Sequence, residues 1–82
     1  MIRVLFLAQL REQLGTPELQ IPAGSVGSIA ALKHYLVATN PEWERFLSNS
    51  KLLVAVNHEY AKGDKAIKSG DEVAFFPPVT GG

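Results

Sequence analysis

The 82-residue sequence contains no cysteine and only two histidines. The absence of cysteine excludes disulfides, a thiolate nucleophile and cysteine-based zinc sites. The histidines, His34 and His58, lie far apart and lack the spacing of metal ligands. No apolar run approaches the roughly 20 residues of a membrane-spanning helix. The first residues contain one early cation, Arg3, without a small-residue cleavage site, so we expect a cytoplasmic protein without a signal peptide.

An excess of charge of one sign is also lacking. Eight basic and eight acidic residues give a formal net charge of +0, whereas nucleic-acid-binding proteins usually carry a basic excess. We therefore expect no nucleic-acid partner. The sequence shows no catalytic triad and no phosphate-binding loop, and its short length leaves little room for an enclosed active site.

Hydrophobic periodicity predicts strands and helices within one α+β domain. The predicted strands cover residues 2–8, 18–22, 52–56, 60–61 and 72–76, with a turn over residues 57–59, and the predicted helices cover residues 9–14, 29–39 and 41–47. Ser28 is suited to cap the longest helix, in which Ile29, Leu32 and Leu36 form the buried stripe. For residues 1–76 we expect a mixed sheet with one main helix packed across it, arranged as in the ubiquitin-like β-grasp fold.

The end of the sequence is predicted to be an extended tail. It consists of Pro77, Pro78, Val79, Thr80, Gly81 and Gly82. The two prolines stiffen the chain, and the two glycines make a slender tip that fits a narrow channel in another protein. At roughly 3.3 Å per residue the extended tail reaches about 20 Å. A competing interpretation is a frayed end without function.

The only reactive group at the tip of this tail is the α-carboxylate of Gly82. An α-carboxylate has an ordinary pKa of about 3.3–3.7, so at neutral pH it is an anion that resists nucleophilic attack. A partner must activate it, for example as an acyl-adenylate made with ATP. Glycine leaves the carbonyl unhindered and lets the backbone approach a nucleotide closely. These properties predict a carrier whose own terminus is the substrate of other proteins.

A second feature is a set of apolar side chains that strand alternation turns away from the core. The set consists of Leu5, Leu7, Tyr60 and Phe76. Exposed apolar patches commonly mark protein interfaces, so we expect a partner to dock there. Two alternatives stay open. The helix over 41–47, with Trp43 and Phe46, covers the patch, or the strand register is shifted by one residue.

Three segments resemble the MoaD-type sulfur carriers, the small subunits of molybdopterin synthase with a ubiquitin-like fold. The segments are the opening IRVLFLAQLRE, the middle KLLVAVN and the ending GDEVAFFPPVTGG. The ending is the most specific, because related carriers of the thiamine pathway share the diglycine but not usually the Phe-Pro-Pro segment. Leu7 and Tyr60 depart from the family pattern, in which a phenylalanine and an aliphatic residue are usual, but both keep apolar area.

The resemblance implies a cycle with several partners. An adenylyltransferase similar to ubiquitin-activating enzymes would use ATP to adenylate the Gly82 carboxylate, and a sulfurtransferase would supply sulfur to leave a thiocarboxylate. In a heterotetramer with the large synthase subunit, the tail would enter that subunit. Its sulfur would attack a cyclic pyranopterin monophosphate to build the dithiolene of molybdopterin. The chain would bind no cofactor or metal itself, and the catalytic side chains would belong to its partners.

Three other functions stay open at this point. A ubiquitin-like modifier would be joined to lysines of other proteins through its terminal glycine. A sulfur carrier of the thiamine thiazole pathway would use the same diglycine for a different acceptor. A plain interaction module would dock through its apolar patch, and its tail would be incidental.

Overall fold

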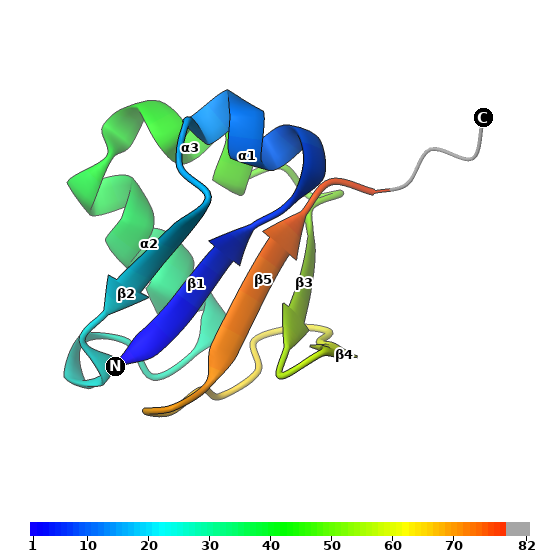
Figure 1. Ribbon diagram of the computed structural model, residues 1–82. Helices are drawn as coiled ribbons and strands as arrows, with labels where there is room; N and C mark the ends of the chain where they lie inside the picture. The colour runs from blue at the N-terminus through cyan, green and yellow to red at the C-terminus, as the bar shows by residue number, and fades with distance from the viewer. Residues whose placement is uncertain (79–82) are drawn as a thin grey trace.

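The structure describes residues 1–78 (Figure 1). Its five strands are built from alternating apolar residues. In this computed structural model the strands are β1 (Ile2–Phe6), β2 (Glu18–Ile21), β3 (Leu53–Val56), β4 (Glu59–Tyr60) and β5 (Glu72–Phe76). The helices of the same residues are α1 (Ala8–Leu14), α2 (Ile29–Thr39) and α3 (Glu44–Leu47), with 3-10 turns at Ala23–Ser25 and Pro41–Trp43.

The sheet has the strand order β2-β1-β5-β3-β4. Strands β1 and β5 run parallel, and the other neighbouring strands are antiparallel. Strand β5, from the end of the described chain, therefore lies at the centre of the sheet between β1 and β3. A mixed sheet of this order with a helix across one face is the ubiquitin-like β-grasp, so the expected α+β class is confirmed.

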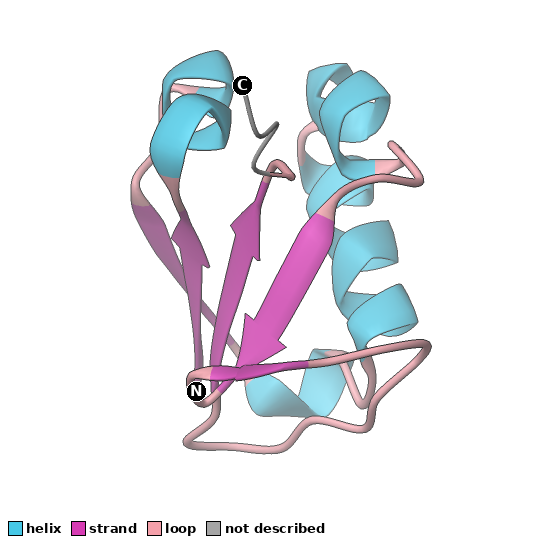
Figure 2. Cartoon of the chain, turned by 90° about the vertical axis from the view of Figure 1, so that its right-hand side faces the viewer, coloured by secondary structure: helices cyan, strands magenta, loops and turns pink. Residues whose placement is uncertain are grey.

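The main helix α2 covers one face of the sheet (Figure 2). The predicted stripe of Ile29, Leu32 and Leu36 is buried. The hydroxyl of Ser28 accepts a hydrogen bond from a backbone N–H in the first turn, as expected for an N-cap residue. The short helix α1 lies at the end of the sheet where β1 and β5 finish, and it buries two leucines there.

Three aromatic side chains join the sheet to the segment that follows α2. Phe6 of β1 stacks on Phe75 of β5 with ring centroids 6.2 Å apart, and Trp43 meets Phe6 edge-on at 5.4 Å. All three rings are buried. The predicted helix over 41–47 is divided into a 3-10 turn and α3, and it packs on the same side of the sheet as α2.

The end of β1 differs from the prediction. The strand stops at Phe6 and not at Ala8, because Leu7 is the residue that precedes α1 and Ala8 adopts a left-handed φ of 54°. A residue whose backbone torsions lie in the left-handed region cannot continue an extended strand. Strands β2 and β3 are also shorter than predicted, because residues predicted at an end of each strand lie outside it.

The hairpin between β3 and β4 also differs from the prediction. Asn57 and His58 have φ angles of 51° and 71°, and they form a two-residue turn that pairs Val56 with Glu59. Positive φ at both central residues is typical of the tight turns that match the twist of a hairpin. Strand β4 therefore begins one residue earlier than predicted, because Glu59 belongs to the strand and not to the turn, whereas Asn57 lies in the turn as expected.

Candidate functional site

The face of the sheet opposite α2 carries the candidate docking surface. Residues paired across a sheet point their side chains to the same face. The register aligns one row of apolar residues from four strands, namely Leu5, Ala74, Ala55 and Tyr60. Phe76 pairs with Leu53 in the next row, and Leu7 continues the alternation of β1. We call these seven residues the open-face patch; Figure 1 views their face of the sheet with α2 behind it.

The structure places all four predicted docking residues in the open-face patch. Tyr60 and Leu7 are 74% and 41% exposed, whereas Leu5 and Phe76 are half-buried between their neighbours. The ring of Tyr60 lies 5.8 Å from the ring of Phe76. A shift of the strand register by one residue is excluded, because it would turn these side chains toward α2. That a partner binds these four residues stays a prediction.

Sequence reasoning missed two members of the patch, Leu53 and Ala55, whereas strand alternation alone turns a further member, Ala74, away from the core. Ala74 lies on the open face but is only 8% exposed, because the paired residues Leu5 and Ala55 flank its small side chain. The missing signal is the strand order, which decides the neighbours of β5. With these residues included, the apolar surface extends without a break from β1 to β4.

The segment over 41–47 does not cover this patch. Trp43 lies against Phe6, whose buried side chain points to the α2 side of the sheet. Phe46 is half-buried and packs against the same core. The alternative in which this helix hides the patch is therefore wrong.

The tail begins at the end of the sheet beside the patch. The backbone N–H of Leu7 donates to the carbonyl oxygen of Phe75 at 3.0 Å, and Phe76 is still paired with β3. Pro77 and Pro78, which have no N–H to donate, follow outside the strand and are half-buried. The root of the tail is thus fixed by β1 and β3. The other predicted tail residues, Val79, Thr80, Gly81 and Gly82, lie outside the described residues.

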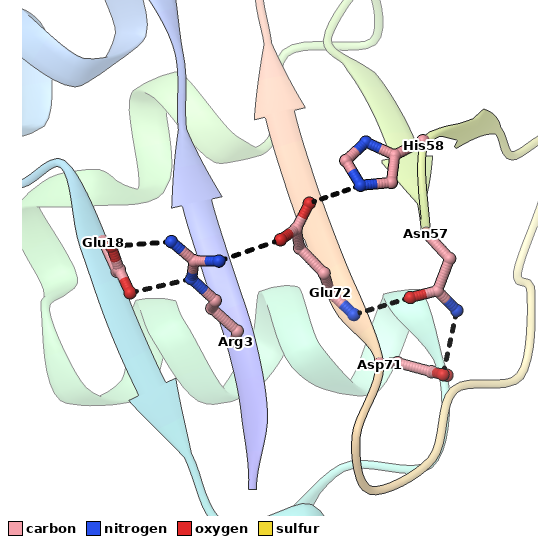
Figure 3. A network of polar contacts seen from close by, with 6 residues as sticks. All are labelled: Arg3, Glu18, Asn57, His58, Asp71 and Glu72. Carbon is pink, nitrogen blue, oxygen red and sulfur yellow. Dashed lines mark hydrogen bonds and ion pairs between the residues drawn. The ribbon is translucent and has the colours of Figure 1, made fainter.

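A row of polar side chains crosses the open face next to the patch (Figure 3). Arg3 donates from Nε to a carboxylate oxygen of Glu18 at 2.8 Å, and from Nη1 to Oε1 of Glu72 at 3.1 Å. Nε2 of His58 lies 3.4 Å from Oε2 of Glu72. The hydrogen bond between Arg3 and Glu18 raises the pKa of the guanidinium and lowers the pKa of the carboxyl. We call these four residues the ionic row.

Among the described residues, Asp71 is the charged residue that is buried. It lies directly before β5. Its carboxylate accepts hydrogen bonds from the side-chain amide of Asn57 at 3.0 Å and from the backbone N–H of Lys68 at 2.9 Å. These two hydrogen bonds lower the pKa of Asp71. The side-chain oxygen of Asn57 accepts from the backbone N–H of Glu72, so the cluster ties the hairpin turn to the start of β5.

Metal sites, pockets and membrane-spanning helices are absent from the described part of the chain. Within residues 1–78, no three side chains of metal-ligating type are grouped so that they could hold a metal ion. These residues form no pocket. None of their helices has the length and apolar character needed to cross a membrane. The features that stand out on the described surface are the open-face patch, the ionic row and the root of the tail.

Comparison with known proteins gives matches over the full length. The chain is 45% identical over 82 residues to the molybdopterin synthase sulfur carrier subunit of Escherichia coli, with 100% of both chains covered. It is 42% identical over 82 residues to the protein of the same name from Haemophilus influenzae, again with 100% of both covered. The crystal structure of SAMP1, small archaeal modifier protein 1, from Haloferax volcanii is similar with a TM-score of 0.80 and 28% identity, covering 99% of this chain and 98% of that one.

The family match extends across nearly the whole sequence. A family described as the ThiS family matches residues 4–82, a range that includes the open-face patch and the segment that ends in the diglycine. The resemblance to small sulfur-carrier subunits is confirmed by this match together with the two full-length relatives. The chain therefore belongs to the ThiS family and is a relative of the molybdopterin synthase sulfur carrier subunits.

Proposed function

We propose that this chain is the sulfur carrier subunit of a molybdopterin synthase and that it works in the cytoplasm. The observation that carries the proposal is its 45% identity, over the full length, to a protein of that name. The root of the tail lies beside an exposed apolar patch, which suits a carrier that docks through its sheet and presents its end to a partner. Residues 1–76 are then the docking domain, and residues 77–82 are the carrier tail.

In the first step of this proposal the Gly82 carboxylate gains a leaving group. In the active site of a ubiquitin-activating-like adenylyltransferase, a carboxylate oxygen attacks the α-phosphorus of ATP, and pyrophosphate leaves. A hydrosulfide equivalent from a sulfurtransferase then attacks the carbonyl carbon, and AMP leaves with the bonding electrons. The product is a thiocarboxylate, whose sulfur is a stronger nucleophile than the carboxylate oxygen it replaces.

In the second step the tail enters the large synthase subunit within a heterotetramer. The thiocarboxylate sulfur forms a bond to a carbon of cyclic pyranopterin monophosphate, and the carbon–oxygen bond at that carbon breaks, so that the oxygen leaves with the bonding electrons and takes up a proton. Water then hydrolyses the acyl–sulfur bond of the resulting thioester, which leaves the sulfur on the substrate and returns Gly82 to its carboxylate form. Two such transfers supply the two sulfurs of the molybdopterin dithiolene. Docking through the open-face patch makes each delivery effectively unimolecular, while the partners provide the catalytic side chains.

Intact-mass spectrometry tests the proposal. The full chain is incubated with ATP, a sulfur source, and the adenylyltransferase and sulfurtransferase of the same organism. We expect a mass gain equal to the replacement of one oxygen by one sulfur. The matched control carries one alanine after Gly82, which keeps the domain and the tail but moves the carboxylate, and it should gain no mass. Sulfur incorporation in the extended chain, or none in the unextended chain, contradicts the proposed role of Gly82.

A second candidate function is protein modification through an isopeptide bond. The similarity to small archaeal modifier protein 1 favours it, at 28% identity and a TM-score of 0.80. Denaturing gels distinguish the two functions, since a modifier gives covalent conjugates of higher mass, and a carrier gives a thiocarboxylate without such bands. Adding the large synthase subunit and cyclic pyranopterin monophosphate separates the molybdopterin carrier from a thiamine-pathway carrier, because only the molybdopterin carrier yields molybdopterin.

A further inference from the structure

We propose that the ionic row is the second half of the docking surface, and that the carboxylate of Glu72 forms an ion pair with a lysine or arginine side chain of the large synthase subunit. This inference rests on the proposed function for the identity of the partner. It extends the docking surface beyond apolar contact and gives it a polar contact that orients the two proteins. Its basis is the position, the charge and the hydrogen bonding of the four residues of the row.

The ionic row is continuous with the open-face patch. Arg3 and Glu72 pair with each other across β1 and β5, and Leu5 and Ala74 pair two residues further along the same strands. Residues two positions apart on a strand lie about 7 Å apart on the same face. A protein surface that covers the row from Leu5 to Tyr60 therefore reaches the ionic row as well.

The row carries an excess of negative charge. One cation, Arg3, faces two carboxylates, Glu18 and Glu72, which leaves a formal charge of about −1 when His58 is neutral. The neighbouring carboxylate of Asp71 is held by other groups, since Asn57 and Lys68 hydrogen-bond to it. Charge complementarity therefore favours a cationic side chain from the partner.

The two oxygens of Glu72 are held unequally. Oε1 accepts from Arg3 at 3.1 Å, whereas the one polar contact of Oε2 among residues 1–78 is with the imidazole of His58 at 3.4 Å. The His58 side chain is 85% exposed, and exposed pairs of this kind contribute little to stability. A cation from a partner can therefore replace the imidazole at Oε2 and leave the contacts among Arg3, Glu18 and Oε1 in place.

Association kinetics with two matched variants test this inference. Glu72→Gln and Glu59→Gln change the net charge equally, but Glu59 pairs with Val56 and points to the α2 side of the sheet. The association rate constant with the purified large subunit is measured at about 0.01 M and about 1 M salt, where the Debye lengths are about 30 Å and about 3 Å. We expect Glu72→Gln to associate about threefold more slowly at low salt, with a smaller difference at high salt, and Glu59→Gln to match the wild type.

A third variant is expected to change the association rate constant in the opposite direction. Arg3→Gln removes the cation and makes the row more negative, so it should associate faster than the wild type at low salt. Circular dichroism melts confirm that each variant is folded before its kinetics are compared. Equal rates for Glu72→Gln and Glu59→Gln, or slower association of Arg3→Gln, overturn the inference. If the wild type still forms the thiocarboxylate and molybdopterin in that case, the proposed function stands and only the role of the ionic row is wrong.

Discussion

The ring of Tyr60 lies 5.8 Å from the ring of Phe76, although one residue belongs to the edge strand β4 and the other ends the central strand β5. Phe76 directly precedes Pro77, so this contact joins an aromatic side chain that is 74% exposed to the root of the tail. A protein that covers Tyr60 is therefore also placed beside the point where the tail leaves the sheet. In the proposed function, this pair would link docking of the partner to delivery of the tail.

Tyr60→Ala is expected to weaken binding of the large subunit without destabilising the domain. Aromatic anchors of interfaces typically contribute about 2 kcal/mol or more, which is roughly a thirtyfold change in Kd. The exposed ring makes few contacts in the isolated chain, so the free energy of unfolding should change by no more than about 0.5 kcal/mol. Titration calorimetry and urea denaturation measure the two quantities. Tyr60→Phe, which keeps the ring, should bind like the wild type, and wild-type affinity of Tyr60→Ala would remove Tyr60 from the docking surface.

Gly81→Ala is expected to reduce thiocarboxylate formation without lowering the melting temperature. A methyl group widens the tip of the tail and restricts its torsions, which hinders entry into the partner's narrow channel. The rate of sulfur incorporation by mass spectrometry and the melting temperature by circular dichroism are measured together. Thr80→Ser, which adds no volume, is the control and should keep the wild-type rate. A parallel loss of rate and melting temperature contradicts a role confined to the tail.

The open face of the sheet could be predicted from the sequence because side-chain direction in a strand depends only on alternation. Once Val73 and Phe75 are assigned to the core, Phe76 has to point away from it, and the structure agrees. The neighbours of each strand depend on long-range pairing, which alternation does not encode. For this reason the contributions of Leu53 and Ala55 to the patch appear only in the structure.

The burial of loop residues could not be predicted from the sequence either. Val26 and Ile67 are buried at 2% and 6% exposure, but both lie outside the periodic strands and helices. The backbone N–H of Ile67 donates to the carbonyl oxygen of Gly27, and this contact brings two distant loops together at the start of α2. A single apolar residue in a polar loop carries no periodic signal, so its burial depends on where the rest of the chain places it.

Helix α1 offers a stability prediction, because both of its ends use the left-handed region. Ala8 has φ 54° and Gly15 has φ 67°. A residue with a side chain in this region costs roughly 1–2 kcal/mol. Glycine avoids this cost but loses more backbone entropy on folding, which offsets part of the gain. We expect Ala8→Gly to raise the free energy of unfolding by about 0.5 kcal/mol and Gly15→Ala to lower it by about 1 kcal/mol, as measured by urea denaturation.

The surroundings of Gly15 make this pair of variants informative. A Cβ added at Gly15 would meet no atom within 4 Å, so a loss of stability there reports backbone strain and not a steric clash. If Gly15→Ala leaves the stability unchanged, the left-handed conformation at this helix end carries no cost for alanine. The same result would also remove the reason to expect a gain from Ala8→Gly.

Asp71 gives a prediction for the dependence of stability on pH. The hydrogen bonds from Asn57 and Lys68 lower its pKa in the folded protein, whereas an aspartate in the unfolded chain has a pKa of about 3.9. The folded state therefore binds this proton less readily than the unfolded state. Its stabilising effect is complete well above about pH 4 and is lost as the pH falls through the lowered pKa of the folded state.

Urea denaturation of Asp71→Asn at a series of pH values measures this effect. The wild type should be more stable than the variant at pH 7, and the difference should shrink below about pH 4 as the wild-type carboxylate becomes protonated. Asn57→Gly removes one of the two hydrogen bonds but tolerates the left-handed turn, so it should reduce the pH-dependent part of the difference without abolishing it. If the stability curves of the wild type and Asp71→Asn stay parallel from neutral to acidic pH, the hydrogen bonds to Asp71 do not favour its ionised form.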